Sequence, residues 1–274
     1  SRRRLFGNKA AVAGMIVLAL LTVIAFIGPL LWPHSYEYQY QDRLGLSPTA
    51  ENMHWLGTDI LGRDMVARLL IGLQISLAVG FIAAFVALVI GVAWGAVAGF
   101  AGGRVDQFMM RIVDVLYAVP FIFFVILVTV VFGRHIFLIF LAIGAVEWMT
   151  MARIVRGQTL SLKGKEFIEA AEAAGVSTRD IIRRHILPNV IGPVIVYVTL
   201  TVPAVILVES FLSFLGLGVQ EPFTSWGVLI ADGKDQMESY PWMLIFPAVF
   251  MAITLFCFNF IGDGLRDALD PKDR

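Results

Sequence analysis

The chain has 274 residues, of which 58% are apolar and 15% charged, with a mean hydropathy of +0.81 and a formal net charge of zero. A soluble domain carries about 25% charged residues, so this composition excludes an ordinary soluble protein. Zero net charge argues against nucleic acid as a partner, and the single cysteine, Cys257, excludes a disulfide framework and cysteine-rich metal sites.

Long uncharged segments recur along the chain, and each reaches the roughly 20 residues that a helix needs to cross a bilayer. They cover residues 10–31, 69–103, 115–133, 186–208 and 239–262. A sixth segment, 136–152, contains one acid. These segments predict an all-α polytopic membrane protein with six transmembrane helices. Since the 35-residue second segment is too long for one upright helix, we interpret its first residues as an interfacial helix on the outer side.

We expect a single membrane domain over residues 1–274. The predicted elements are spans at about 10–32, 74–101, 108–132, 136–156, 189–213 and 240–262, a cytoplasmic loop at 157–188, and outer loops at 33–73 and 214–239. Loops rich in lysine and arginine stay in the cytoplasm. If the N-terminus lies inside, 16 of these basic residues fall on inner segments and 5 fall on outer segments. Both termini are therefore expected in the cytoplasm. The basic start and first apolar segment resemble a secretory signal, but that segment is too long and lacks a cleavage site, so we interpret it as a retained helix.

We single out three acid–base pairs whose members lie three or four residues apart, which is the spacing of neighbours on one helix face. They are Asp59 with Arg63, Asp64 with Arg68, and Arg111 with Asp114. We interpret the first two pairs as surface supports of the interfacial helix. The third is interpreted as a local pair near the inner interface.

Small residues recur every four positions on the second span and form a smooth ridge. They are Ala83, Ala87, Gly91, Gly95 and Gly99. Such ridges let helix backbones approach closely in lipid. We expect this ridge to pack against a neighbouring helix, with a role in lining a transport path as the alternative.

Two acids lie in predicted spans without a basic residue at helical spacing singled out beside them, unlike Asp114. Glu147 lies well inside the fourth span, where a charged side chain costs about 2.5–3.5 kcal/mol, so it is expected to face the bundle interior or a wet cavity. Two roles are open for Glu147: it is a paired structural acid, or it is a contact for a substrate cation or a proton. Glu209 lies near the outer boundary, and three roles are open for it: a buried polar residue, a residue that lines the path, or a contact for a docking protein. Prolines in spans three, five and six are expected to kink their helices, which suits a gate.

The most informative segment, residues 163–189, reads KGKEFIEAAEAAGVSTRDIIRRHILPN. Strong helix formers predict a helix over 166–174, and Gly175 follows where a left-handed cap residue is favoured. Ser177 and Asp180 resemble a capping box, and Pro188 predicts a break before the fifth span. We call residues 163–189 the bracket. Its exposed alanines would let another protein approach closely, although spacing alone equally fits a solvated loop.

The bracket resembles the EAA signature of the permease subunits of ABC importers, through Glu169-Ala170-Ala171, Gly175 and Leu187-Pro188. In that family this loop forms the coupling helix that docks in a groove of the cytoplasmic ATPase. The resemblance implies the following coupling residues: Glu166, Glu169, Ala170, Ala171, Gly175, Leu187 and Pro188. His185 stands where the family commonly has isoleucine, but the surrounding sequence is similar to the peptide and nickel branch.

Residues 54–77, 209–227 and 258–272 also look like the C-type permeases of dipeptide and oligopeptide importers, so the likeness covers nearly the whole chain. It implies the type I importer permease fold, in the bacterial inner membrane, forming part of a path for oligopeptides. Nickel or dipeptide cargo is the alternative within the family. The implied partners are a second permease as heterodimer, two ATPases and an extracytoplasmic peptide-binding protein.

The sequence contains no Gly-x-x-x-x-Gly-Lys-Ser/Thr loop, so ATP and Mg²⁺ are expected on partner subunits, and we predict neither an enzyme nor a metal site here. A secondary transporter would need buried ion ligands and repeats, for which Glu147 is the sole strong candidate. An intramembrane hydrolase is disfavoured because HExxH and GxSxG motifs do not occur.

Overall fold

The computed structural model describes residues 2–133 and 135–269. Arg134, Lys272 and Arg274, which count in the charge bias, lie outside the described residues. Within them the fold is helical without strands, and the bridge between Thr58 and Asp64 is isolated. The prediction of an all-α protein is confirmed.

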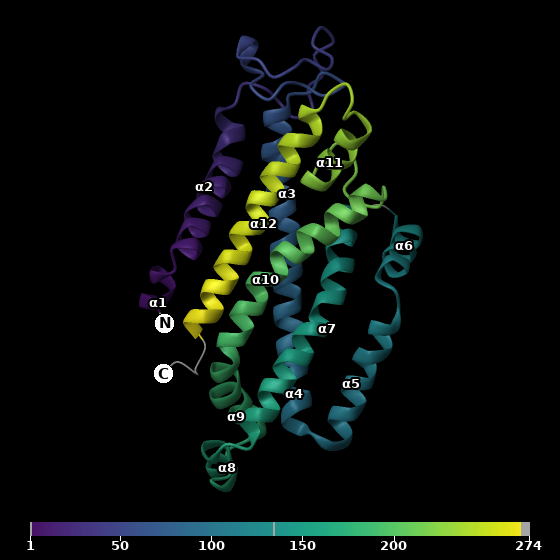
Figure 1. Cartoon of the computed structure of the whole chain (residues 1–274). Coiled ribbons are helices and arrows are strands. Elements are labelled where there is room, and N and C mark those ends of the chain that lie inside the picture. Colours follow the sequence, from purple (N-terminus) through teal and green to yellow (C-terminus); the bar gives the residue numbers. More distant parts are fainter. Residues whose placement is uncertain (1, 134, 270–274) are drawn as a thin grey trace.

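The long helices lie side by side, with the segment between α2 and α3 at one end of the molecule and α8 at the other (Figure 1). The helix bounds are α1 Arg2–Gly7, α2 Lys9–Leu31, α3 Met65–Val86, α4 Val92–Ala101, α5 Gly103–Ala118, α6 Phe121–Phe132, α7 Ile136–Lys163, α8 Glu166–Ala173, α9 Thr178–Ile181, α10 Leu187–Phe214, α11 Trp226–Asp235 and α12 Trp242–Leu269. A 3₁₀ turn covers Glu51–Met53, and π-helical turns cover Ala87–Gly91 and Ile182–Ile186.

Among the described residues, five helices are long and apolar enough to cross a membrane. The pair α5 and α6, bent by 80°, gives a sixth when it is counted as one span. The break falls at Val119, whose extended backbone is favoured because Pro120 follows it. The kink expected from the proline in the third span is therefore confirmed, and it is sharp enough to divide the span into two helices.

The prediction of an interfacial helix before the second span is wrong. One helix runs from Met65 through the π-helical turn to Ala101. Its first turns are buried in protein, because Leu69 and Leu73 pack in one cluster with Trp226 of α11. The helix therefore enters the bundle directly instead of lying along the interface.

The prediction of a helix break at Pro188 is also wrong. Pro188 lies in the first turn of α10, directly after the π-helical turn that joins α9 to α10. At the start of a helix the missing N–H of proline is tolerated. Residues Thr178–Phe214 thus form one helical element of 37 residues, which links the bracket to the opposite end of the bundle.

The ridge of small residues packs against α7, as expected. A Cβ atom on Gly91 would lie 2.6 Å from the Cβ of Met151, and one on Gly95 would lie 2.9 Å from the backbone nitrogen of Arg156. Both distances are shorter than ordinary contacts, so α4 and α7 can approach this closely only because these positions are glycine.

The inner half of α7 is also held to α5 by ion pairs that the sequence analysis missed. Arg156 donates two hydrogen bonds to Asp106, at 2.5 and 2.6 Å. The local pair expected between Arg111 and Asp114 is wrong, because Asp114 accepts a hydrogen bond from Arg153 of α7 at 2.9 Å. These charged side chains therefore pair between helices, whereas their spacing in the sequence suggested a pair along one helix.

Candidate functional site

The inner end of the bundle carries the bracket, with α8 projecting beyond the other helices (Figure 1). Gly175 has a left-handed backbone (φ +76°), and its N–H donates to the carbonyl of Glu172 at 2.9 Å. The Ser177 hydroxyl accepts from the backbone N–H of Asp180 and donates to its carboxylate. The predicted glycine turn and cap are both confirmed.

Three isoleucines fasten the bracket to the bundle. Ile168, Ile181 and Ile186 are at most 1% exposed and belong to the same core cluster as Met151 of α7. The short helices α8 and α9 are therefore packed against α7 and α10 through this cluster.

The residues implied by the family resemblance divide into two groups. The exposed ones are Glu166, Glu169, Ala170, Gly175 and Pro188. Ala171 and Leu187 are half-buried and pack against the core cluster that holds the bracket. Exposure therefore leaves the first group free to touch a partner, whereas Ala171 and Leu187 support the bracket from within.

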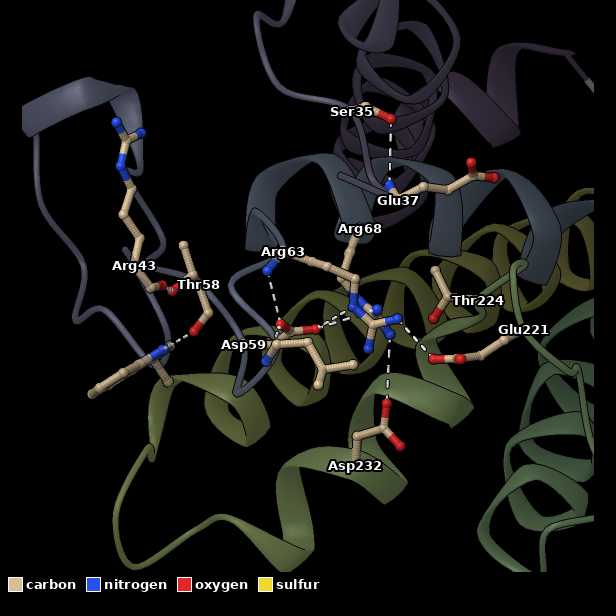
Figure 2. A network of polar contacts seen from close by, with 12 residues as sticks. Ser35, Glu37, Arg43, Thr58, Asp59, Arg63, Arg68, Glu221, Thr224 and Asp232 are labelled. Carbon is tan, nitrogen blue, oxygen red and sulfur yellow. Dashed lines mark hydrogen bonds and ion pairs between the residues drawn. The ribbon is translucent and has the colours of Figure 1, made fainter. Parts of the chain in front are cut away.

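At the outer end, Asp59 is the centre of a buried ion-pair network that we call the outer clamp (Figure 2). Its carboxylate accepts from the Nε of Arg63 at 2.6 Å and lies 3.3 Å from the guanidinium of Arg68. Arg63 also donates to Glu221 at 2.7 Å, and Arg68 lies 3.5 Å from Asp232 of α11. The clamp thus ties the start of α3 to the loop before α11 and to α11 itself.

The predicted pair of Asp59 and Arg63 is present, but it is buried and does not support a surface helix. The pair expected between Asp64 and Arg68 is wrong. The carboxylate of Asp64 instead accepts from the ring of His54 at 2.8 Å, from the indole of Trp32 at 2.9 Å and from a backbone N–H of α3. Asp64 therefore caps α3 and holds the outer loop together.

His34, His54 and Asp64 offer ligand atoms within 4.8 Å of one another. Their atoms are already partnered, since His34 contacts the Tyr40 hydroxyl at 2.7 Å and the carbonyl of Asn52 at 2.8 Å, and His54 bridges Asp64 and Arg43. The two imidazole rings stack at 4.2 Å. This arrangement is that of a folded loop core, and a metal ion would have to displace these hydrogen bonds.

Glu209 does not reach the outer surface, which agrees with a buried polar residue and excludes a contact with a docking protein. Its side chain is completely buried and accepts from the hydroxyls of Ser213 at 2.7 Å and Ser225 at 2.6 Å. Ser225 caps α11, and Trp226 next to it donates its indole N–H to the carbonyl of Leu69. Glu209 therefore fixes α11 within the outer half of the bundle. The analysis of the sequence missed Ser225, which a helix-capping pattern before α11 could have revealed.

Glu221, the most exposed side chain of the outer clamp, provides a test by pH. The hydrogen bond and charge of Arg63 lower the pKa of Glu221 below its ordinary value of 4.5. The ionised carboxylate therefore stabilises the fold above that value, and this contribution is lost as pH falls through the lowered pKa. We expect the wild-type protein in detergent to lose more thermal stability than Glu221→Gln when the pH is taken from above to below 4.5. Equal losses would show that the pair contributes nothing.

Glu147 lies on α7 at half depth and is partly exposed, and Tyr197 of α10 lies near it. The sequence analysis singled out Glu147 but missed Tyr197. A tyrosine within a run of aliphatic and threonine residues is the signal that could have found it.

Two family models match the chain. Residues 91–274 match the binding-protein-dependent transport system inner membrane component, and residues 1–48 match the N-terminal transmembrane domain of oligopeptide transport permease C. The first match covers the bracket, the broken third span and α11.

Curated relatives extend the likeness over the whole chain. The oligopeptide transport system permease protein OppC of Haemophilus influenzae is 57% identical over 274 residues, which are 100% of this chain and 88% of that protein. OppC of Escherichia coli is also 57% identical, over 91% of its length. The dipeptide transport system permease protein DppC of Bacillus subtilis is 50% identical over 99% of this chain and 85% of its own.

Solved structures agree on the fold. Two inward-facing structures of the MetNI methionine ABC transporter align with TM-scores of 0.60 and 0.61, at 20% and 19% identity. They cover 75% and 81% of this chain and 98% and 100% of theirs. The helices and the bracket, the family models and the relatives agree: the chain belongs to the binding-protein-dependent transport family, the multi-pass inner-membrane permeases of bacterial ABC importers.

Proposed function

We propose that this chain is a permease subunit that forms part of the path for oligopeptides through the bacterial inner membrane. The observation that carries the proposal is the 57% identity with OppC proteins across all 274 residues. The closeness of DppC at 50% identity makes dipeptides the next cargo to test, and nickel is the other alternative within the family.

The proposed coupling site is the exposed side of the bracket. Glu166, Glu169 and Ala170 of α8 would enter a groove of a cytoplasmic ATPase, with Gly175 and Pro188 beside them. The side chain is short at Ala170, which allows close approach, while the glutamates supply charge. Ala171 and Leu187 keep the bracket in position. Movement of the ATPase would then reach the spans through the buried isoleucines.

The proposed assembly contains a second permease as heterodimer, two ATPases and an extracytoplasmic peptide-binding protein. ATP and Mg²⁺ would be bound by the ATPases. The charge bias supports a cytoplasmic position for both termini and the bracket. The outer clamp and α11 would then face the binding protein.

Reconstitution of the assembled complex in proteoliposomes tests the function. With the binding protein and ATP present, we expect uptake of labelled tripeptides to pentapeptides, and none without ATP. Uptake of dipeptides or nickel in place of longer peptides would overturn the proposed cargo. Uptake driven by an ion gradient without ATP would overturn the importer assignment.

A further inference from the structure

Helix α5 lies at one edge of the bundle (Figure 1). Of its 16 residues the structure buries two, Asp106 and Val113. By comparison, 11 of the 28 residues of α7 are buried. Because packed side chains hold the helices of a membrane protein together, α5 is attached to the rest of this chain much more weakly than α7.

Both ends of α5 are built as joints. At the inner joint, Gly102 and Gly103 have left-handed backbones, with φ of +66° and +54°. A Cβ atom on Gly103 would meet open space in the part of the chain that the structure describes, so close packing does not fix this backbone, and glycine readily changes its dihedral angles. At the outer joint, Val119 and Pro120 lie between α5 and α6, which are bent by 80°. Helix α5 is thus a rigid segment between two joints.

Ion pairs to α7 hold α5 in place between these joints. Asp106 accepts two hydrogen bonds from the guanidinium of Arg156, at 2.5 and 2.6 Å. Asp114 accepts one from Arg153 at 2.9 Å. We call these four residues the latch. The arginine side chains are 34% and 44% exposed, and partly exposed ion pairs contribute little net stability because water replaces the lost partner. The latch can therefore open and close again.

A recess of about 420 Å³ lies beside the outer joint, between α5, α6 and α7. Leu116 and Phe124 line it from the broken span, and Val146 and Trp148 line it from α7. Protein interiors contain few voids larger than a water molecule, so this recess is space that packing has left unfilled. The outer end of α5 can therefore tilt towards α7 without first displacing packed side chains.

The last turns of α7 carry both the latch and the start of the bracket. Arg156 lies seven residues before Lys163, where α7 ends and the bracket begins. The Lys163 ammonium donates to the carbonyl of Phe100 at 2.6 Å, directly before the inner joint of α5. The residues that fasten α5 and its inner joint therefore belong to the same stretch of α7 that joins the bracket.

We propose that α5 is a hinged strap that swings at its two joints, and that movement of the bracket opens the latch in each transport cycle. This rests on the proposed function, because ATPases bound to the bracket supply the movement. The latch is closed in this structure. At 1.5 Å per residue α5 is about 24 Å long, so a rigid-body tilt of about 15° moves its inner end by about 6 Å.

Distances between spin labels test the strap in the assembled complex. In a Cys257→Ala background with cysteine-free partner subunits, labels are attached to Gln107→Cys on α5 and Gln158→Cys on α7, which are exposed positions. Pulsed electron paramagnetic resonance measures their separation without nucleotide and with ADP and vanadate trapped in the ATPases. We expect the separation to change by about 6 Å. The control pair, Val97→Cys on α4 with Gln158→Cys, should not change, because the glycine ridge packs α4 against α7.

Removal of one charge tests the latch without nucleotide. Asp106→Asn keeps the size of the side chain but loses the ionic pairing with Arg156. We expect the nucleotide-free separation between α5 and α7 to shift towards the trapped value. Asp42→Asn, which removes an acid from an exposed ion pair of the outer loop, is the matched control and should leave the separation unchanged. If Asp106→Asn impairs assembly, Asp114→Asn tests the more exposed pair of the latch.

Each remaining outcome decides against part of the proposal. A separation that neither trapping nor Asp106→Asn alters, or an equal change in the control pair, would overturn the strap. A change on trapping that Asp106→Asn does not reproduce would overturn the latch, and the reverse would overturn its opening in the cycle. ATP hydrolysis that vanadate inhibits confirms trapping. Its absence would contradict the proposed function instead, and the Asp106→Asn comparison would still test the strap.

Discussion

Replacing Glu169 with lysine is expected to release the ATPases from the complex and abolish ATP-dependent uptake. Glu169 is exposed on α8, where the proposed groove would enclose it. Removing one partner of a buried interfacial charge pair costs about 2–5 kcal/mol, and charge reversal adds repulsion. Binding would weaken by more than about tenfold, since each 1.4 kcal/mol is one factor of ten. Co-purification of ATPases with the tagged permease measures the loss.

Glu238→Lys is the matched control, because it makes the same charge change at an exposed position of the opposite loop. Gly175→Pro is a second variant of the bracket and alters the turn without changing charge. We expect both bracket variants to retain the second permease while losing ATPase. Full ATPase retention in both would contradict the coupling site, and equal loss with Glu238→Lys would point to a general effect of charge.

The second large effect is expected at the contact between α4 and α7. A methyl group on Gly95 would overlap backbone and side-chain atoms of α7 around Ala152 and Val155, and overpacking of this kind costs about 1–3 kcal/mol. Gly95→Ala is therefore expected to lower the thermal stability of the detergent-solubilised permease. The size of the loss is a direct measure of how tightly these helices are held.

Gly192→Ala separates packing from helix propensity. At Gly192 the new methyl group has its nearest neighbour at 3.9 Å, on Leu269. Alanine favours helix over glycine by about 1 kcal/mol, so this variant should be neutral or stabilised. The two substitutions are thus expected to have opposite signs. A stabilised Gly95→Ala protein would mean that α4 and α7 separate without cost.

Local features were predictable from the sequence. The number of spans follows from uncharged length, and the left-handed turn at Gly175 follows from its position after a run of helix formers. The ridge through Gly91 and Gly95 was readable because close packing requires small side chains at helical spacing. Each of these properties depends on residues near one another in the chain.

Partners distant in the chain were not predictable. Arg68 was assigned to Asp64, four residues away, but its contacts include Asp232, 164 residues away. The sequence left a surface contact of Glu209 open because its position along α10 is outer, but α11 folds back and covers it. Nor does the spacing in the EAA signature distinguish Ala170, which is exposed, from Ala171, which packs inward.

The continuous helix from Thr178 to Phe214 has a mechanical consequence. At 1.5 Å per residue, its 37 residues form an arm about 55 Å long. A tilt of about 5° at the bracket then moves the far end by about 5 Å, roughly one helical turn. That end carries Glu209, which accepts a hydrogen bond from Ser225, the N-cap residue of α11. In the proposed assembly, a small rotation at the bracket would be enlarged into a displacement on the opposite side of the membrane.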